Sequence, residues 1–369
     1  MVGARIWLPE AALQGLIDQL RASGYEVVGP RVADGAVTLV EVTSISEMPR
    51  GVRDEQEPGK YRLTVIEGAG LFDHVVGPHS LKPYLFPPRT TVLEVLKIRD
   101  SWDARVPEPP RPKRAVIGVR SCDLHALAIQ DRVFLGGQHR DPEYAARREG
   151  LFLIAVNCSR SAPTCFCVSM NTGPKVDGGA DLVLTELNTG FVVEVGTEKG
   201  GEVLRGLDIR ESTLAEFAEA TEVPQRAASQ QTRRINLATV HDTLINNLEH
   251  PRWEDVAKRC LSCANCTMVC PTCFCSTVNE VTDLAGDVTT RERVWESCFN
   301  EEHSWTGSGA AHPTTKSRYR QWLTHKLATW VDQFGSSGCV GCGRCITWCP
   351  VGIDITEEVA AIEAKGGVA

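Results

Sequence analysis

The chain has 369 residues, with 39 Lys or Arg against 47 Asp or Glu, so its formal net charge is −8 at pH 7. At roughly 150 residues per domain, this length predicts two or three domains, and an acidic balance argues against nucleic-acid binding, which requires clustered Lys and Arg. No apolar run reaches the ~18 residues of a membrane span and no signal peptide is evident, so we expect a cytoplasmic chain without a membrane span.

The first hundred residues predict one helix and several short strands. Apolar residues recur at helical spacing between residues 9 and 24, so a helix is expected to begin near Pro9 and to end at Gly24. Strand-like runs follow at residues 25–28, 36–42 and 61–66. The polar stretch 52–60 predicts a loop, and the proline-rich stretch 106–113 predicts an extended connector.

A βαβ-like unit is expected next. The apolar runs 115–119 and 151–156 predict buried strands, and residues 123–135 between them have helical spacing. Cys122 and Cys158 therefore follow the carboxyl ends of two neighbouring strands, where α/β sheets usually bind ligands. A hairpin is predicted at 182–195, followed by helices at 213–223 and 225–248.

The 15 cysteines are the most informative residues. Eleven of them lie between residues 260 and 349, and this density in a cytosolic protein favours metal binding over disulfides. Two runs have the spacing C-x2-C-x2-C-x3-C-P: Cys260, Cys263, Cys266 and Cys270, and then Cys339, Cys342, Cys345 and Cys349. Each matches the bacterial ferredoxin run for a [4Fe–4S] cluster. A structural zinc site needs only four thiolates and does not explain why this order occurs twice.

The ferredoxin run predicts a crossed ligation, because its fourth cysteine binds the other cluster. One cluster is expected to use Cys260, Cys263, Cys266 and Cys349. The other is expected to use Cys339, Cys342, Cys345 and Cys270.

Seven cysteines lie outside these runs, and their spacing leaves two interpretations open. Cys122, Cys158, Cys165 and Cys167 are either buried free thiols or a third four-cysteine site. For Cys273, Cys275 and Cys298, three thiols do not complete a cubane alone, so packing beside the clusters is favoured over a further metal site. The pentapeptide Pro-Thr-Cys-Phe-Cys occurs at both 163–167 and 271–275.

These observations predict an α+β domain with a βαβ-like unit at 1–235, followed by a helical, ferredoxin-like domain with two [4Fe–4S] clusters at 236–369. The second domain contains a long insertion at 273–338, which includes a basic helical stretch at 318–330. We find no nucleotide-binding glycine fingerprint, no P-loop and no nucleophile elbow. We therefore assign no catalytic residues and expect an electron carrier, with a self-contained iron–sulfur reductase and a zinc-bound scaffold as alternatives.

Several segments resemble one family. They are Gly118–Ala126 (GVRSCDLHA), Asn157–Cys158, Cys165–Met170 (CFCVSM), Thr172–Pro174, Cys270–Cys275, Trp295–Cys298, Arg318–Arg320 and Cys339–Cys345. The cluster motifs occur in many ferredoxin modules, so the specific segments are CDLHA at 122–126 and CFCVSM at 165–170. Together all these segments resemble the iron–sulfur beta subunit of cytosolic bidirectional [NiFe] hydrogenases of the sulfhydrogenase type, a family that includes the electron-input subunit of anaerobic sulfite reductase. The resemblance covers most of the chain from about residue 60 onward, and it favours a third [4Fe–4S] cluster at the four N-terminal cysteines.

The resemblance also implies partners. In this family a flavoprotein subunit with FAD and a [2Fe–2S] centre exchanges hydride with NAD(P)H. The beta subunit then relays single electrons to or from a catalytic partner. We expect this partner to be the small subunit of a [NiFe] hydrogenase, next to the large subunit. The alternative is the sirohaem subunit of an anaerobic sulfite reductase.

Overall fold

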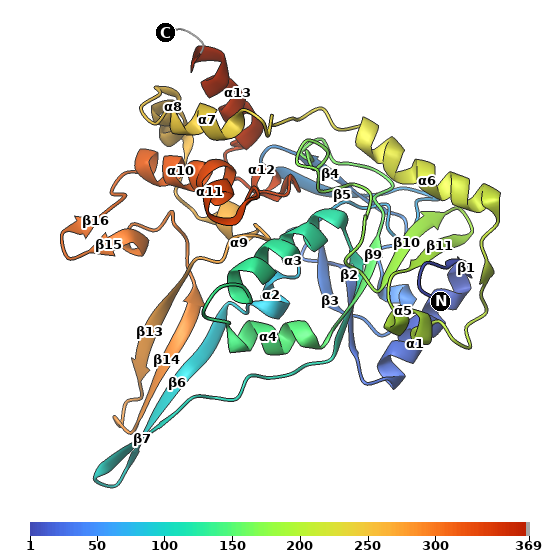
Figure 1. Ribbon diagram of the computed structural model, residues 1–369, viewed down its shortest axis with the longest axis horizontal. Coiled ribbons are helices and arrows are strands. Elements are labelled where there is room, and N and C mark those ends of the chain that lie inside the picture. The colour runs from blue at the N-terminus through green and yellow to red at the C-terminus, as the bar shows by residue number, and fades with distance from the viewer. Residues whose placement is uncertain (367–369) are drawn as a thin grey trace.

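The computed structural model describes residues 1–366 and divides them between a sheet-based half and a helical, cysteine-rich half (Figure 1). The strands are β1 (Arg5–Pro9), β2 (Glu26–Ala33), β3 (Ala36–Glu41), β4 (Val52–Glu57), β5 (Lys60–Val65), β6 (Arg89–Ile98), β7 (Ser101–Arg105), β8 (Arg114–Val119), β9 (Leu151–Val156), β10 (Leu182–Leu187), β11 (Gly190–Val195), β12 (Arg210–Glu211), β13 (Ser276–Thr282), β14 (Val288–Trp295), β15 (Trp305–Thr306) and β16 (Gly309–Ala310). The α-helices are α1 (Leu13–Ala22), α2 (Lys82–Leu85), α3 (Ser121–Phe134), α4 (Pro142–Glu149), α5 (Glu198–Val203), α6 (Leu214–Ser229), α7 (Val240–Ile245), α8 (Arg252–Arg259), α9 (Asn265–Met268), α10 (Thr315–Thr324), α11 (Trp330–Phe334), α12 (Arg344–Thr347) and α13 (Ile355–Gly366).

An eight-stranded mixed sheet forms the centre of the first half, in the order β12-β1-β11-β10-β9-β8-β2-β3. Strands β2, β8, β9 and β10 are parallel neighbours, and β8, α3 and β9 form the predicted βαβ unit. Every residue of β9 is buried, because helices cover both faces of the sheet. Helix α1 packs on one face, and α3 and α4 pack on the other.

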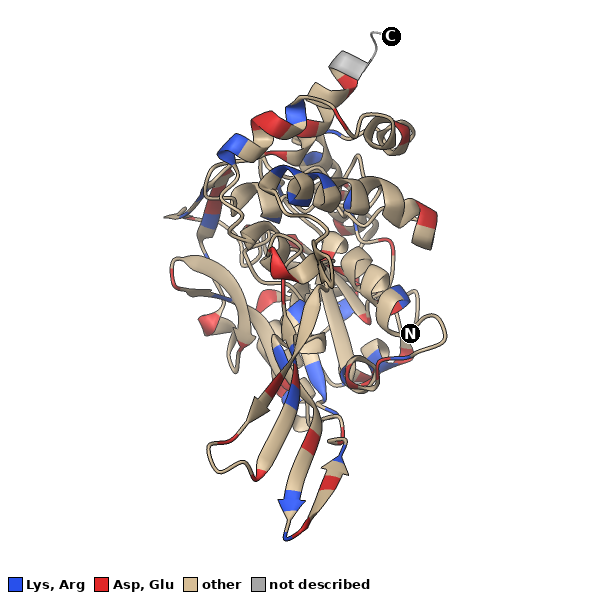
Figure 2. Ribbon diagram, turned by 90° about the vertical axis from the view of Figure 1, so that its left-hand side faces the viewer, with Lys and Arg blue, Asp and Glu red and all other residues tan. Residues whose placement is uncertain are grey.

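A second, four-stranded sheet extends away from the rest of the molecule as an arm (Figures 1 and 2), with the order β13-β14-β6-β7. Its β14 comes from the predicted insertion at 273–338, yet it pairs antiparallel with β6, nearly two hundred residues earlier in the chain. The two halves of the sequence therefore share a sheet. The domain limits 1–235 and 236–369 stay predictions.

The C-terminal half packs around its own core of aromatic and aliphatic side chains. Trp253, Tyr319, Trp322 and Leu327 are fully or nearly fully buried there, and partly buried cysteines of both runs pack against this core. The basic stretch predicted to be helical forms α10, a π-helical turn η4 (His325–Thr329) and α11. Among residues 1–366, no helix is long and apolar enough to cross a membrane.

Two local predictions are wrong. Residues 52–57 form strand β4, paired with β5, rather than a loop, because the chain reverses directly at 58–59. The helix expected at 225–248 is interrupted: α6 ends at Ser229 and α7 begins at Val240. The helix start predicted near Pro9 is confirmed, because Pro9 precedes a short 3₁₀ helix, Glu10–Ala12, that leads directly into α1.

The interruption between α6 and α7 has a tertiary cause. Side chains of this segment bind distant groups: Gln231 Nε2 donates to Cys167 Sγ at 3.1 Å, and Arg233 pairs with the buried carboxylate of Asp354. These contacts hold the segment across both halves of the molecule, and no local periodicity encodes them.

Candidate metal centre

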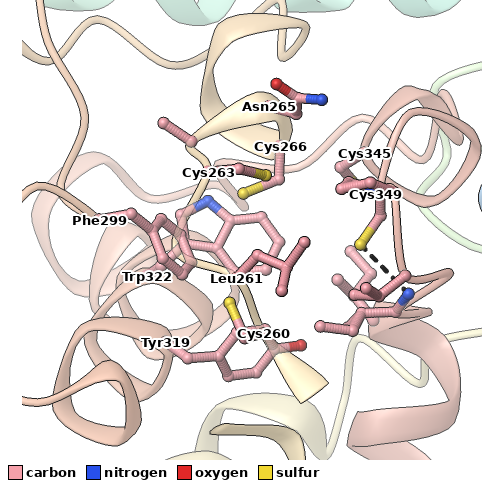
Figure 3. Close-up of a pocket in the computed structure, with 15 residues that line it drawn as sticks. Cys260, Leu261, Cys263, Asn265, Cys266, Phe299, Tyr319, Trp322, Cys345 and Cys349 are labelled. Atoms are coloured by element: carbon pink, nitrogen blue, oxygen red, sulfur yellow. Dashed lines mark hydrogen bonds between the residues drawn. The ribbon is translucent and has the colours of Figure 1, made fainter. Parts of the chain in front are cut away.

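The structure brings Cys349 to the first cysteine run. Cys260 follows α8, Cys263 and Cys266 flank the start of α9, and Cys349 lies just after α12. All four line one pocket, which aromatic residues such as Tyr319 and Trp322 also line (Figure 3). Near this pocket the chain turns tightly, with Ser262 and Ala264 in the left-handed region at φ 51° and 67°.

Backbone N–H groups point at the sulfurs of this pocket. Ser262 N donates to Cys260 Sγ at 3.5 Å. Ile353 N donates to Cys349 Sγ at 3.3 Å, which is the dashed line in Figure 3. Such donors stabilise thiolate ligands and adjust the reduction potential of a bound cluster. Burial raises the pKa of Cys266 well above its usual range, with the neighbouring Cys260 and Cys349 adding to it.

Cys270 lies instead with the second run. Burial raises the pKa of Cys339 to about 12, with the charges of Cys342 and Cys270 adding to it against Lys326. Burial also raises the pKa of Cys345, and the charges of Cys339, Cys342 and Cys270 add to that rise. The structure thus brings Cys349 to the first run and Cys270 to the second, while Cys345 of the second run also lines the first pocket. The crossed ligation itself stays a prediction.

A lysine that the sequence analysis did not single out lies against this second group. Lys326 is only 5% exposed, and its Nζ donates to Cys270 Sγ at 3.4 Å and to Thr272 Oγ1 at 3.0 Å. Burial disfavours its charge, but the neighbouring cysteines, Cys270 first, outweigh this and hold the pKa of Lys326 well above its usual range. A buried cation needs an anionic partner, so this position fits a deprotonated, metal-bound Cys270.

The four N-terminal cysteines also lie together. Cys122 is in the first turn of α3, Cys158 follows β9, and Cys165 and Cys167 lie in the loop beyond it. Burial raises the pKa of Cys165 well above its usual range, and Cys167 and Cys158 add to that rise. Burial likewise raises the pKa of Cys122, and one of the lesser contributions comes from Cys167.

This N-terminal group adjoins the second cysteine run. Cys122, Cys165 and Cys167 belong to one apolar cluster, against which Cys342 packs. Two glycines allow the approach: a Cβ on Gly341 would lie 2.7 Å from the Cys167 backbone, and one on Gly343 would lie 2.5 Å from Thr164 O. Phe166 N also donates to Gly341 O at 2.9 Å.

A buried ion pair locks the two loops together. Arg344, between Cys342 and Cys345, lies 2.8 Å from Asp123, the residue after Cys122. Both side chains are almost completely buried, and Arg344 also donates to Gly77 O at 2.9 Å. The pair holds the start of α3 against the second cysteine run.

Cys273, Cys275 and Cys298 form a further group near Cys270. Lys326 Nζ donates to Cys273 Sγ at 3.6 Å. A hydrogen bond from the Cys298 thiol, followed by one from His303, lowers the pKa of Cys275 to about 4. Sequence reasoning missed His303, because it is not part of a recognisable histidine motif.

The comparisons with known proteins agree with this geometry. Residues 259–353 match the 4Fe–4S dicluster domain family. The chain is therefore a protein with a ferredoxin-type domain for two [4Fe–4S] clusters.

The sulfhydrogenase 2 subunit beta of Pyrococcus furiosus is 34% identical to this chain over 256 residues, which cover 67% of this chain and 74% of that protein. The chain belongs to the family of sulfhydrogenase beta subunits, as the resemblance in its sequence predicted. No solved structure matched the chain. The α+β first half and the helical dicluster half confirm the predicted fold class.

Proposed function

We propose that this chain relays single electrons between an NAD(P)H-linked flavoprotein subunit and the small subunit of a [NiFe] hydrogenase. The proposal includes two [4Fe–4S] clusters with crossed ligands, in which Cys349 completes the set of the first run and Cys270 completes the set of the second. It also includes a third cluster, bound by Cys122, Cys158, Cys165 and Cys167. The observation that carries it is the contact of Cys342 with the N-terminal cysteine group, which supports a continuous path from one cysteine set to the next.

The bound clusters supply one-electron redox chemistry, and the residues of the chain do the rest. Cysteine thiolates hold the iron, and backbone donors such as Ile353 N stabilise the charge on the sulfurs. Buried rings such as Trp322 exclude water, which keeps the local dielectric low.

The experiment compares NAD(P)H-linked with dye-linked hydrogen production in the complete hydrogenase complex. Cys342→Ser is expected to abolish the NAD(P)H-linked reaction and to leave the reaction driven by a reduced viologen dye, which delivers electrons to the catalytic subunits directly. Lys199→Met, on the exposed surface, serves as the control and is expected to retain both reactions. Unchanged NAD(P)H-linked activity in Cys342→Ser contradicts the relay.

The same preparation distinguishes the alternative acceptor. A complex that reduces sulfite with NAD(P)H and produces no hydrogen identifies the partner as a sirohaem sulfite reductase. The third site is tested separately by iron analysis, in which Cys122→Ser is expected to lower the iron content by about four atoms per chain. An unchanged iron content makes the four N-terminal cysteines structural thiols.

A further inference from the structure

The base of the β13–β14 hairpin gathers donor groups that the relay does not use. Cys275 immediately precedes β13, and Cys298 follows β14 by three residues. The strand register pairs Ser276 with Trp295, and Glu296 N donates to Cys275 O at 2.9 Å. This antiparallel pairing brings the thiols of Cys275 and Cys298 into contact.

A histidine completes the group, and it is oriented by a carboxylate. His303 contacts Cys275, and its Nδ1 lies 3.1 Å from Glu296 Oε2. A histidine that binds a metal usually makes such a bond from its other ring nitrogen, which fixes the ring and leaves Nε2 for the metal.

The repeated pentapeptide connects this group to the proposed third cluster. In the copy at 163–167 the two cysteines belong to the proposed third site, and in the copy at 271–275 they are Cys273 and Cys275. Both copies contact the second cysteine run through a buried threonine: Thr164 Oγ1 lies 2.9 Å from Thr347 Oγ1, and Thr272 Oγ1 donates to Gly338 O at 2.8 Å. The second cysteine run therefore contacts two copies of one cysteine-bearing motif.

Two buried lysines lie beside the second copy. Lys326 is only 5% exposed, and its Nζ donates to Cys270 Sγ at 3.4 Å and to Cys273 Sγ at 3.6 Å. Lys82 is only 4% exposed; its Nζ donates to Met268 O at 2.9 Å and lies over the Trp295 ring at 4.0 Å, at the end of β14. The hairpin base is therefore packed against buried lysine side chains, one of which contacts the Cys273 sulfur directly.

We propose that the base of this hairpin binds a fourth iron–sulfur cluster. Its ligands are Cys273, Cys275, Cys298 and His303. Histidine replaces cysteine as an iron ligand in known clusters, so three thiolates and one imidazole form a complete set.

The donors do not converge on a single metal ion. Within residues 1–366, no three His, Cys, Asp or Glu side chains are arranged to hold a single metal ion. The other twelve cysteines likewise form no site for a single metal ion. The ligands of a cluster bind different irons, so they are spread farther apart than the ligands of one ion. Binding of a cluster here requires the contacting sulfurs of Cys275 and Cys298 to move apart, which a rotation about χ1 would achieve.

The test is elemental analysis of the full chain purified without oxygen. With four clusters we expect about 16 irons per chain, and the double variant Cys275→Ser/Cys298→Ser is expected to lose about four of them. The matched control His312→Cys, at a histidine outside the hairpin base, is expected to lose none. An unchanged iron content in the double variant overturns the proposal. The proposal is also overturned if the unmodified chain contains about one zinc and the double variant loses it, because the site then binds zinc.

A second measurement stands if the double variant does not fold. Pulsed EPR of the reduced protein, labelled with ¹⁵N-histidine, is expected to show a histidine nitrogen coupled to one cluster, and His303→Cys is expected to remove the coupling and retain the iron. A wild-type spectrum without that coupling overturns the assignment of His303. The proposed relay is tested separately, by the iron content of Cys122→Ser and the hydrogenase activity of Cys342→Ser. Both substituted cysteines lie outside this hairpin, so a failure of the relay is distinguishable from a failure of the fourth cluster.

Discussion

Lys326→Met gives the sharpest test of how the protein sets the potential of its second cluster. The Lys326 ammonium is buried and lies 3.4 Å from Cys270 Sγ, a proposed ligand of that cluster. A positive charge at this position stabilises the reduced cluster, which carries one more electron. Replacing it with the uncharged Met side chain, of similar length, is therefore expected to lower the reduction potential.

The magnitude follows from the distance. At an effective dielectric constant of about 20, two unit charges 3.4 Å apart interact by about 5 kcal/mol. At 59 mV per 1.4 kcal/mol for one electron, this corresponds to about 200 mV. The added electron is spread over the whole cluster and lies on average farther away than the sulfur, so we expect a decrease of about 100 mV.

The assay is a redox titration of the full chain monitored by EPR. The signal of the second cluster is expected to move to lower potential by about 100 mV. Lys326 Nζ also lies 3.6 Å from Cys273 Sγ, so the proposed fourth cluster is expected to move in the same direction, while the other signals stay within about 20 mV. Lys199→Met, which removes an exposed charge, is the control and is expected to move none. A second-cluster potential that stays constant or rises refutes the electrostatic reasoning, and a shift confined to a different cluster refutes the assignment of Cys270.

Three further predictions concern ligation and stability. Cys349→Ser is expected to lower the iron content by about four atoms and to remove the signal of the cluster at Cys260; loss of the other cluster alone contradicts the crossed ligation. Arg344→Met breaks the buried pair with Asp123 and is expected to cost about 3–5 kcal/mol in urea denaturation, against less than about 1 kcal/mol for the exposed Arg111→Met; equal costs contradict a structural role for the pair. Burial, with two nearby arginines, holds the pKa of the His74 imidazole well below 6.5. Below pH 6.5 the imidazole therefore binds a proton in the unfolded chain and not in the folded one. The free energy of unfolding is expected to fall as the pH falls, by up to about 1.4 kcal/mol per pH unit. His74→Gln is expected to reduce this dependence between pH 6.5 and 5.5, and identical slopes disprove the linkage.

The wrong local predictions share a physical origin. The stretch 52–57 is polar, yet it forms a strand because β5 follows immediately and supplies hydrogen-bonding partners. The segment after Ser229 has helical composition, but contacts of Gln231 and Arg233 with distant groups outweigh its local preference. Propensity decides such segments only where tertiary contacts do not compete.

The sequence by itself determined the chemistry of the dicluster half. Regular cysteine spacing is a local property, because three thiolates within seven residues can reach only the irons of one cluster. The sequence also predicted the buried strands at 115–119 and 151–156, because continuous apolar runs are typical of strands that are covered on both faces.

Only the tertiary structure decided which distant groups meet. It placed Cys122, Cys158 and the Cys165–Cys167 loop together and against Cys342, and it brought Lys326 and His303 to the thiols near Cys270. Neither the lysine nor the histidine belongs to a motif. Their roles come from close packing across β14, the π-helical turn and the cysteine loops, and contacts between residues so far apart in the chain leave no periodic pattern in the sequence.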